Sequence, residues 1–290
     1  MIVQIAIWGI VNGGIYAILA LGFSLMFGVA RVLNLAQGAL LMVSAYFVYI
    51  FTSILHLNAP LSIVLAIFLG ALIGVIIYRL LISRIEEHHT SVVLMTLTIA
   101  LALEEIIMLI FSAHYRRADP FIPGSISLMG VNIPNQYWLT LGVVLICLIG
   151  CWILLYGTRV GLAIRAIAQD REIANVMGIN AGKVYVIVMA LGTALAGIAG
   201  IMVAPIYVLS PLMGWHPLSM MLAVVVLGGL GSIKGSVIGA FILAFVEAIV
   251  VFLVPSGGFL KSVVALVIVI AVLLIRPEGL YGVAFEEERL

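Results

Sequence analysis

The sequence predicts an all-α protein that crosses a membrane many times, a polytopic transmembrane helical bundle with about eight or nine spans. Two observations predict it. Apolar residues make up 65% of the 290 residues and charged residues only 9%, whereas soluble domains have roughly 25% charged residues. Several uncharged stretches also exceed the roughly 20 residues that a helix needs to cross a bilayer. We therefore treat residues 1–290 as a single transmembrane domain in which some helices are broken or re-entrant.

Charged and turn-forming residues divide the chain into spans. Arg31 ends the first uncharged stretch, and the segment from Asn58 to Pro60 divides the second. A proline-containing loop over 113–136 follows the fourth span, and Pro211 and Pro217 bound a short connection later in the chain. The nine predicted spans are 2–30, 38–55, 60–78, 91–111, 137–156, 184–209, 218–227 and two that end near Val254 and Ile275.

The longest charged interlude between spans is the stretch 158–183, TRVGLAIRAIAQDREIANVMGINAGK. Its periodicity predicts an amphipathic helix of about four turns, from about Ala163 to Met177, with Gly178 as its C-terminal stop. The two faces of this helix are Ile164, Ile167, Ala168 and Ala174 on the apolar side and Arg165, Gln169 and Glu172 on the polar side. Two interpretations remain open: a helix that lies on lipid headgroups, and a helix that docks a soluble protein.

Polar side chains near the spans and a glycine-rich stretch are candidates for parts of a transport pathway. The stretch GGLGSIKGS, at 228–236, predicts a broken helix of the kind that builds substrate pathways in transporters. It does not match a phosphate-binding loop, because Lys234 is not preceded by glycine. The candidate pathway residues are Asn12, Asn34, Gln37, Gly228, Gly229 and Gly231.

Three carboxylates fall inside predicted spans, and a carboxylate within a bilayer indicates function by default. Glu104 and Glu105 belong to the fourth span and Glu247 to the eighth. A role in transport coupling is one interpretation, and a role at the interface or in helix pairing is the other. No catalytic motif or metal-ligand spacing occurs, and Cys147 and Cys151 are not spaced as a Cys-x-x-Cys pair. The sequence therefore predicts neither an enzyme nor a bound metal, and a net charge of +1 gives no sign of nucleic-acid binding.

The distribution of basic residues predicts an orientation in the membrane. If the stretch 158–183 is cytoplasmic and the spans alternate, only Arg116, Arg117 and Lys261 of the 13 basic residues lie outside. This arrangement puts the N-terminus and the loop 113–136 outside the cytoplasm and the C-terminus inside. The short seventh span is the weak point, because a re-entrant segment there would invert everything that follows.

Three blocks of the sequence resemble one family. GLAIRAIAQDREIANVMGIN, within 158–183, is similar to the cytoplasmic coupling loop of branched-chain amino acid ABC permeases, and specifically of the shorter of that family's two permease types. The stretches 12–46 and 225–248 resemble the N-terminal and C-terminal signatures of the same family, and the three blocks occur in the family's order. Gln37 is a departure, since many relatives carry histidine there.

This resemblance implies one permease subunit of an ATP-driven importer in a bacterial or archaeal plasma (inner) membrane. A second permease subunit, usually an unlike chain, would complete the pathway, and an extracytoplasmic solute-binding protein would deliver a branched-chain or other hydrophobic amino acid. Two cytoplasmic ATPase subunits would bind ATP and Mg, so this chain would bind no cofactor. The coupling helix would sit in a cleft of an ATPase subunit, with Arg165, Asp170 and Glu172 as polar contacts and Ile167, Ala168 and Ala174 as the packed face.

Other interpretations stay open beside this one. Relatives of such permeases carry amides, urea or aromatic carboxylates, and the residues do not select among these cargoes. A secondary transporter driven by an ion gradient would use Glu104, Glu105 or Glu247 as its coupling site. A channel would need neither ATP nor a gradient.

Overall fold

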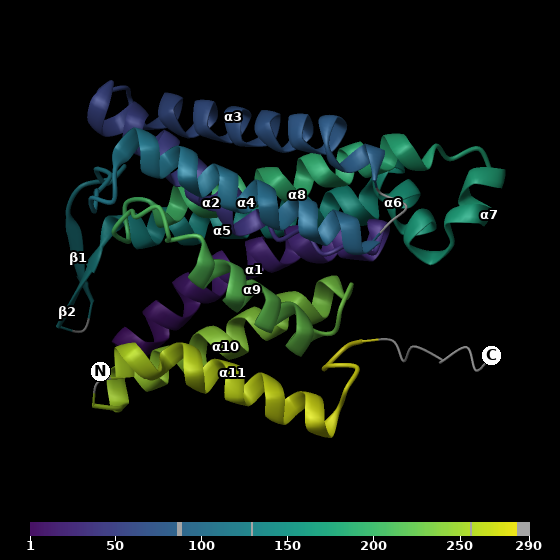
Figure 1. Cartoon of the computed structure of the whole chain (residues 1–290). Helices are drawn as coiled ribbons and strands as arrows, with labels where there is room; N and C mark the ends of the chain where they lie inside the picture. The colour runs from purple at the N-terminus through teal and green to yellow at the C-terminus, as the bar shows by residue number, and fades with distance from the viewer. Residues whose placement is uncertain (86–88, 129, 256, 283–290) are drawn as a thin grey trace.

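The computed structural model describes residues 1–85, 89–128, 130–255 and 257–282, which form a bundle of long helices with a small β-hairpin at one end (Figure 1). Within these described residues, eight helices are long and apolar enough to cross a membrane. The predicted all-α, multi-pass membrane fold is therefore confirmed. The helices are α1 (Ile2–Ala30), α2 (Gln37–Tyr49), α3 (Ala59–Leu80), α4 (His89–Phe111), α5 (Asn135–Gly157), α6 (Arg159–Gln169), α7 (Arg171–Val176), α8 (Ala181–Val203), α9 (Trp215–Gly228), α10 (Ile233–Leu253) and α11 (Gly257–Ile275), with the short turns η1 (Ile50–Ile54) and η2 (Ile82–Arg84).

Helix α1 forms the centre of the bundle, and α10 and α8 make its most extensive contacts. Small residues allow these helices to approach closely. Gly13 of α1 faces the ring of Phe241 in α10, and a Cβ at Gly22 would lie 2.9 Å from the carbonyl oxygen of Gly192 in α8. Lipid tails are as apolar as leucine, so close van der Waals packing, rather than exclusion of water, favours such contacts in a membrane.

The sixth and seventh predicted spans differ from the structure. Helix α8 ends at Val203, before the predicted end at Leu209, and an irregular segment over 204–214 leads into α9. With 14 residues, α9 is too short to cross a bilayer alone. The end of α9 lies beside the residues that follow α11, because the backbone N–H of Leu280 donates to the carbonyl of Leu227 at 2.8 Å. The segment 204–214 and α9 together form one broken crossing, and the start of α1 and the end of α11 lie at opposite ends of the bundle (Figure 1).

The β-hairpin lies within the predicted loop 113–136. Strands β1 (Ser125–Leu128) and β2 (Val131–Pro134) pair antiparallel, with Ser125 opposite Pro134. Before the hairpin, Arg116 and Leu209 form an isolated antiparallel bridge, in which each backbone N–H donates to the other's carbonyl at 3.0 and 2.9 Å. This bridge joins the loop to the irregular half of the broken crossing.

The contact between α2 and α8 gives a test of the packing. A Cβ on Gly200 would clash with the backbone carbonyl of Leu41, and a backbone carbonyl cannot move aside as a side chain can. We expect Gly200→Ala to lower the free energy of unfolding in detergent by about 1–3 kcal/mol. Gly142→Ala is the matched control, because a Cβ at that exposed position in α5 meets no atom within 4 Å. Equal stability of the two variants in denaturant titrations would contradict the packing.

Candidate functional site

The stretch 158–183 protrudes from one end of the bundle as two short helices (Figure 1). They divide at Asp170, whose backbone is extended, with φ −153° and ψ 116°. Its Oδ1 accepts the backbone N–H groups of Glu172 and Ile173 at 2.8 and 2.9 Å, which caps the start of α7. The expectation of one helix of four turns was therefore wrong, because Asp170 caps a second helix. The stop at Gly178 is confirmed by its positive φ of 86°.

Burial in this stretch corrects the direction of its apolar face. Ile164, Ile167 and Ala174 are only 2–3% exposed, and they belong to the core of the bundle together with residues of α1 and α8. Ala168 is half-buried and packs against the same core. Ile167 and Ala174 therefore hold the stretch onto this chain, and they are not free to form a packed face against a partner.

A different set of apolar side chains points away from the bundle. Ile173, Val176 and Met177 are 64%, 86% and 77% exposed, and we call these three residues the outer apolar surface. Asp170, Glu172 and Gln169 are exposed around it. Arg165 is half-buried, and its guanidinium lies 5.0 Å from the centre of the Tyr156 ring in α5.

The three candidate polar side chains of the pathway are buried, and each makes a hydrogen bond within the chain. Asn12 accepts a hydrogen bond from the hydroxyl of Tyr207, which lies in the irregular part of the broken crossing. The Gln37 amide donates to the carbonyl of Leu19 in α1 at 3.2 Å, and its Oε1 has no partner among the described residues. The Oδ1 of Asn34 accepts the N–H of the residue two places on at 3.1 Å. The contacts of Asn12 and Gln37 join α1 to the broken crossing and to α2, whereas that of Asn34 is local.

The candidate glycines lie at the end of the bundle. Gly228 is the last residue of α9 and packs against the backbone of Gly235 in α10. Gly229 and Gly231 have positive φ values of 99° and 80°, which make the turn between the two helices possible. The helix break expected within 228–236 is thus a turn between α9 and α10, whereas the break inside a crossing lies at 204–214.

Glu247, which is fully buried, is the centre of a polar cluster that joins four helices. The Tyr16 hydroxyl in α1 donates to Glu247 Oε2 in α10 at 2.8 Å. His216 Nε2 in α9 lies 3.8 Å from Glu247 Oε1, and its Nδ1 lies 3.3 Å from Ser262 Oγ in α11. The sequence predicted Glu247 as a candidate functional residue, but it did not predict the three neighbours Tyr16, His216 and Ser262. They are far apart in the sequence, and no local pattern connects them.

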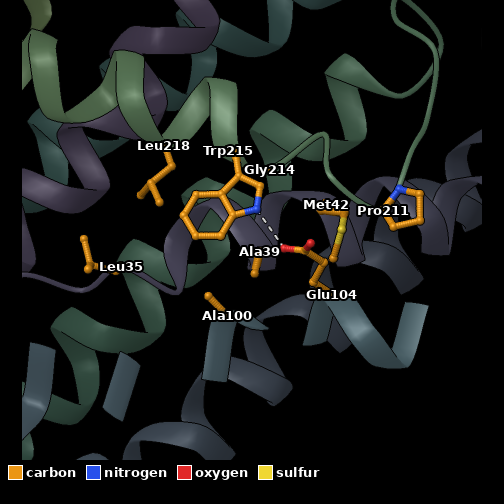
Figure 2. Close-up of a pocket in the computed structure, with 9 residues that line it drawn as sticks. All are labelled: Leu35, Ala39, Met42, Ala100, Glu104, Pro211, Gly214, Trp215 and Leu218. Atoms are coloured by element: carbon orange, nitrogen blue, oxygen red, sulfur yellow. Dashed lines mark hydrogen bonds between the residues drawn. The ribbon is translucent and has the colours of Figure 1, made fainter. Parts of the chain in front are cut away.

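Glu104 and Glu105 on α4 have different surroundings. The indole N–H of Trp215, at the start of α9, donates to Glu104 Oε2 at 2.8 Å (Figure 2). Glu105 is exposed and makes no hydrogen bond or ion pair in the described part of the chain. Beside the Glu104 contact lies a small pocket lined by Leu35, Ala39, Met42, Ala100, Glu104, Pro211, Gly214, Trp215 and Leu218 (Figure 2). Among the described residues, no group of three or more His, Cys, Asp or Glu side chains could hold a metal ion.

Comparison with known proteins covers nearly the whole chain. A sequence model of the family described as "Branched-chain amino acid transport system / permease component" matches residues 5–273. A probable branched-chain amino acid transport permease, LivH of Methanocaldococcus jannaschii, is 30% identical over 96% of this chain and 92% of its own. The high-affinity branched-chain amino acid permease BraD of Pseudomonas aeruginosa is 27% identical over 94% of both chains. The ribose import permease RbsC of Escherichia coli is 29% identical over 89% of this chain and 81% of its own.

A solved structure shares the fold. The structure described as PsaBC from Streptococcus pneumoniae in complex with Fab has a TM-score of 0.54 and 14% sequence identity. The match covers 93% of this chain and 91% of that one. The likeness extends over the bundle and shows a shared arrangement of helices.

The buried cluster around Glu247 gives a second test. Tyr16→Phe removes the hydroxyl that donates to the carboxylate and leaves that oxygen buried without the donor. We expect the free energy of unfolding in detergent to fall by about 1–3 kcal/mol. Tyr137→Phe is the control, because the Tyr137 hydroxyl makes no hydrogen bond among the described residues and its loss should be nearly neutral. In a double-mutant cycle, an additive effect of Tyr16→Phe and Glu247→Gln would show that the two groups do not interact.

Proposed function

Because the chain belongs to the family of branched-chain amino acid transport permease components, we propose that it is one membrane subunit of an ATP-driven, binding-protein-dependent importer. It would form half of the translocation pathway for branched-chain or other hydrophobic amino acids. The observation that carries this proposal is the family match from residue 5 to residue 273. The protruding stretch 158–183 supports it, since it supplies a place where a partner outside the membrane can act (Figure 1).

The partners of this subunit follow from the same proposal. A second permease subunit, which we expect to be an unlike chain, would close the other side of the pathway. Two cytoplasmic ATPase subunits would bind ATP and Mg and hydrolyse the ATP, and an extracytoplasmic binding protein would deliver the cargo. Cargo choice would then depend largely on that binding protein, which suits a family whose relatives include a ribose import permease.

The orientation of the chain is also a proposal, and the charges at the two ends of the bundle support it. The end at which α6 lies carries most of the basic residues, as the positive-inside rule requires of a cytoplasmic face. The helix ends on this side have Arg31, Arg79, Arg84, Arg159, Arg171, Lys183, Lys234 and Arg276 at or beside them, whereas Arg116, Arg117 and Lys261 lie at or beside the opposite helix ends. Arg289 lies outside the described residues. We therefore propose an extracytoplasmic N-terminus and hairpin loop and a cytoplasmic C-terminus.

We propose that the outer apolar surface of Ile173, Val176 and Met177 docks the ATPase subunit. Exposure of these three apolar side chains to water is unfavourable. Their burial in a cleft of a partner would remove that cost. Asp170, Gln169 and Glu172 would make polar contacts at the rim of that cleft. Ile167 and Ala174 would serve a different purpose, since they fix α6 and α7 to α1 and α8.

The energy source gives the decisive test of the proposed function. Vesicles that contain this chain with its permease partner, both ATPase subunits and the binding protein should accumulate branched-chain amino acid only when ATP is present. A protonophore should leave this uptake unchanged while ATP is held constant. Vesicles with this chain alone should accumulate nothing. Accumulation that follows a proton gradient without ATP would instead establish a secondary transporter, with Glu104, Glu105 or Glu247 as coupling sites.

The docking assignment has its own test. Val176→Asp puts a charge into the outer apolar surface, and we expect it to reduce retention of the ATPase subunits in pull-downs from membranes by at least about tenfold. Uptake should fall in parallel, and ATP binding by the isolated ATPase subunits should not change. Leu80→Asp is the control, because Leu80 is 56% exposed at the same end of the bundle, on α3. Full retention of the ATPase by Val176→Asp would contradict the assignment.

A further inference from the structure

Glu105 is an exposed carboxylate well inside a membrane-spanning helix. The apolar part of α4, Thr90–Phe111, is 22 residues long, and Glu105 lies six residues before its end. At 1.5 Å per residue, this position is about 9 Å from the end of the helix. With a hydrocarbon core about 30 Å thick, this position lies inside the core when α4 spans it. Charged groups at such depth face a protein interior or a water-filled cavity rather than lipid.

The face of α4 that carries Glu105 mixes polar and small residues with the exposed leucines Leu94, Leu101 and Leu109. Thr98, Ala102 and Glu105 are all exposed and lie at helical spacings of four and three, so they share one face of α4. On the neighbouring α9, Trp215 and Ser219 are exposed as well. The hydrogen bond from Trp215 to Glu104 joins the two helices beside the small pocket (Figure 2).

Other peripheral helices present different surfaces. Between their end turns, α3, α5 and α11 expose no charged side chain in the described part of the chain. Midway along these helices, Phe68, Ile146 and Ile270 are 62%, 71% and 57% exposed. Such faces suit contact with lipid tails, whereas α4 adds an exposed carboxylate to its exposed leucines, and a carboxylate is costly in lipid.

We infer that the translocation pathway runs along this face of α4 and α9, that the second permease subunit closes it, and that Glu105 attracts the ammonium group of the cargo. The inference rests on the proposed function and adds the location of the pathway to it. A negative charge matches the ammonium end of an amino acid. Leu101 and Leu109, which are 46% and 83% exposed on α4, offer apolar surface to its side chain. The broken crossing supplies the irregular backbone that is tolerated in a membrane where it lines a pathway.

Cysteine labelling of the assembled transporter tests the location. In a background in which Cys147 and Cys151 are replaced by alanine, Ala102→Cys on α4 and Ile146→Cys on α5 put single thiols at similar depths on the two kinds of face. We expect a membrane-impermeant maleimide added from outside to label Ala102→Cys at least tenfold faster than Ile146→Cys. Thr98→Cys is the second pathway variant, in case Ala102→Cys assembles poorly. Equal labelling of both faces, or no labelling on α4 while uptake proceeds, would overturn the inference.

Neutralisation tests the role of the charge. Loss of a charge-assisted hydrogen bond reduces affinity on the order of tenfold, so Glu105→Gln should slow amino acid uptake by about that factor. Glu105→Asp, which keeps the charge, should retain most of the uptake, and both variants should keep ATPase subunits bound. Unchanged uptake by Glu105→Gln would remove Glu105 from the pathway. Cysteine labelling needs no ATP. It therefore locates the pathway even if the proposed ATP-driven import is disproved.

Discussion

Close approach of helix backbones at glycine is the constraint on which the bundle depends. A Cβ at Gly200 or Gly228 would clash with the backbone of a neighbouring helix. A Cβ at Gly22 would meet both the backbone of α8 and the side chain of Gln37. In a bilayer this contact is the main favourable term between apolar helices, because moving an apolar side chain from lipid to protein gains little. The central position of α1 follows from it, and so does the place of Gln37, whose amide nitrogen would lie 2.9 Å from a Cβ at Gly22.

The broken crossing is possible because the same packing surrounds it with protein. Backbone N–H and C=O groups exposed to lipid are costly, so an irregular segment must be covered. Ala204 and Leu209 are fully buried, and the backbone of Leu209 is paired with Arg116 from the loop before the hairpin. Pro211 needs no partner for a backbone N–H. The segment thus brings Tyr207 to Asn12 inside the bundle, and it leads to Trp215, which binds Glu104 at the surface.

Composition and periodicity were sufficient to predict the spans except the sixth and seventh, because long uncharged stretches are typical of membrane helices. The same evidence located the charged stretch 158–183 and its stop at Gly178. It did not predict the direction of the apolar face, since periodicity shows that a face exists but not what covers it. It also missed His216 and Tyr16 beside Glu247, because those contacts join residues 31 and 231 positions away from the carboxylate. The cap at Asp170 could have been found, since aspartate before a short helical pattern is a recognised start signal.

The inward-facing side of α6 has a mechanical consequence. Ile164 and Ile167 pack α6 against the core of the bundle, so α6 is fixed to that core and is not a flexible linker. A displacement imposed at Val176 would be transmitted to the adjoining ends of α1 and α8 instead of being absorbed by bending of the chain between them. Since α1 runs through the middle of the molecule, a tilt of its end at one membrane surface would also move its side chains near the opposite surface.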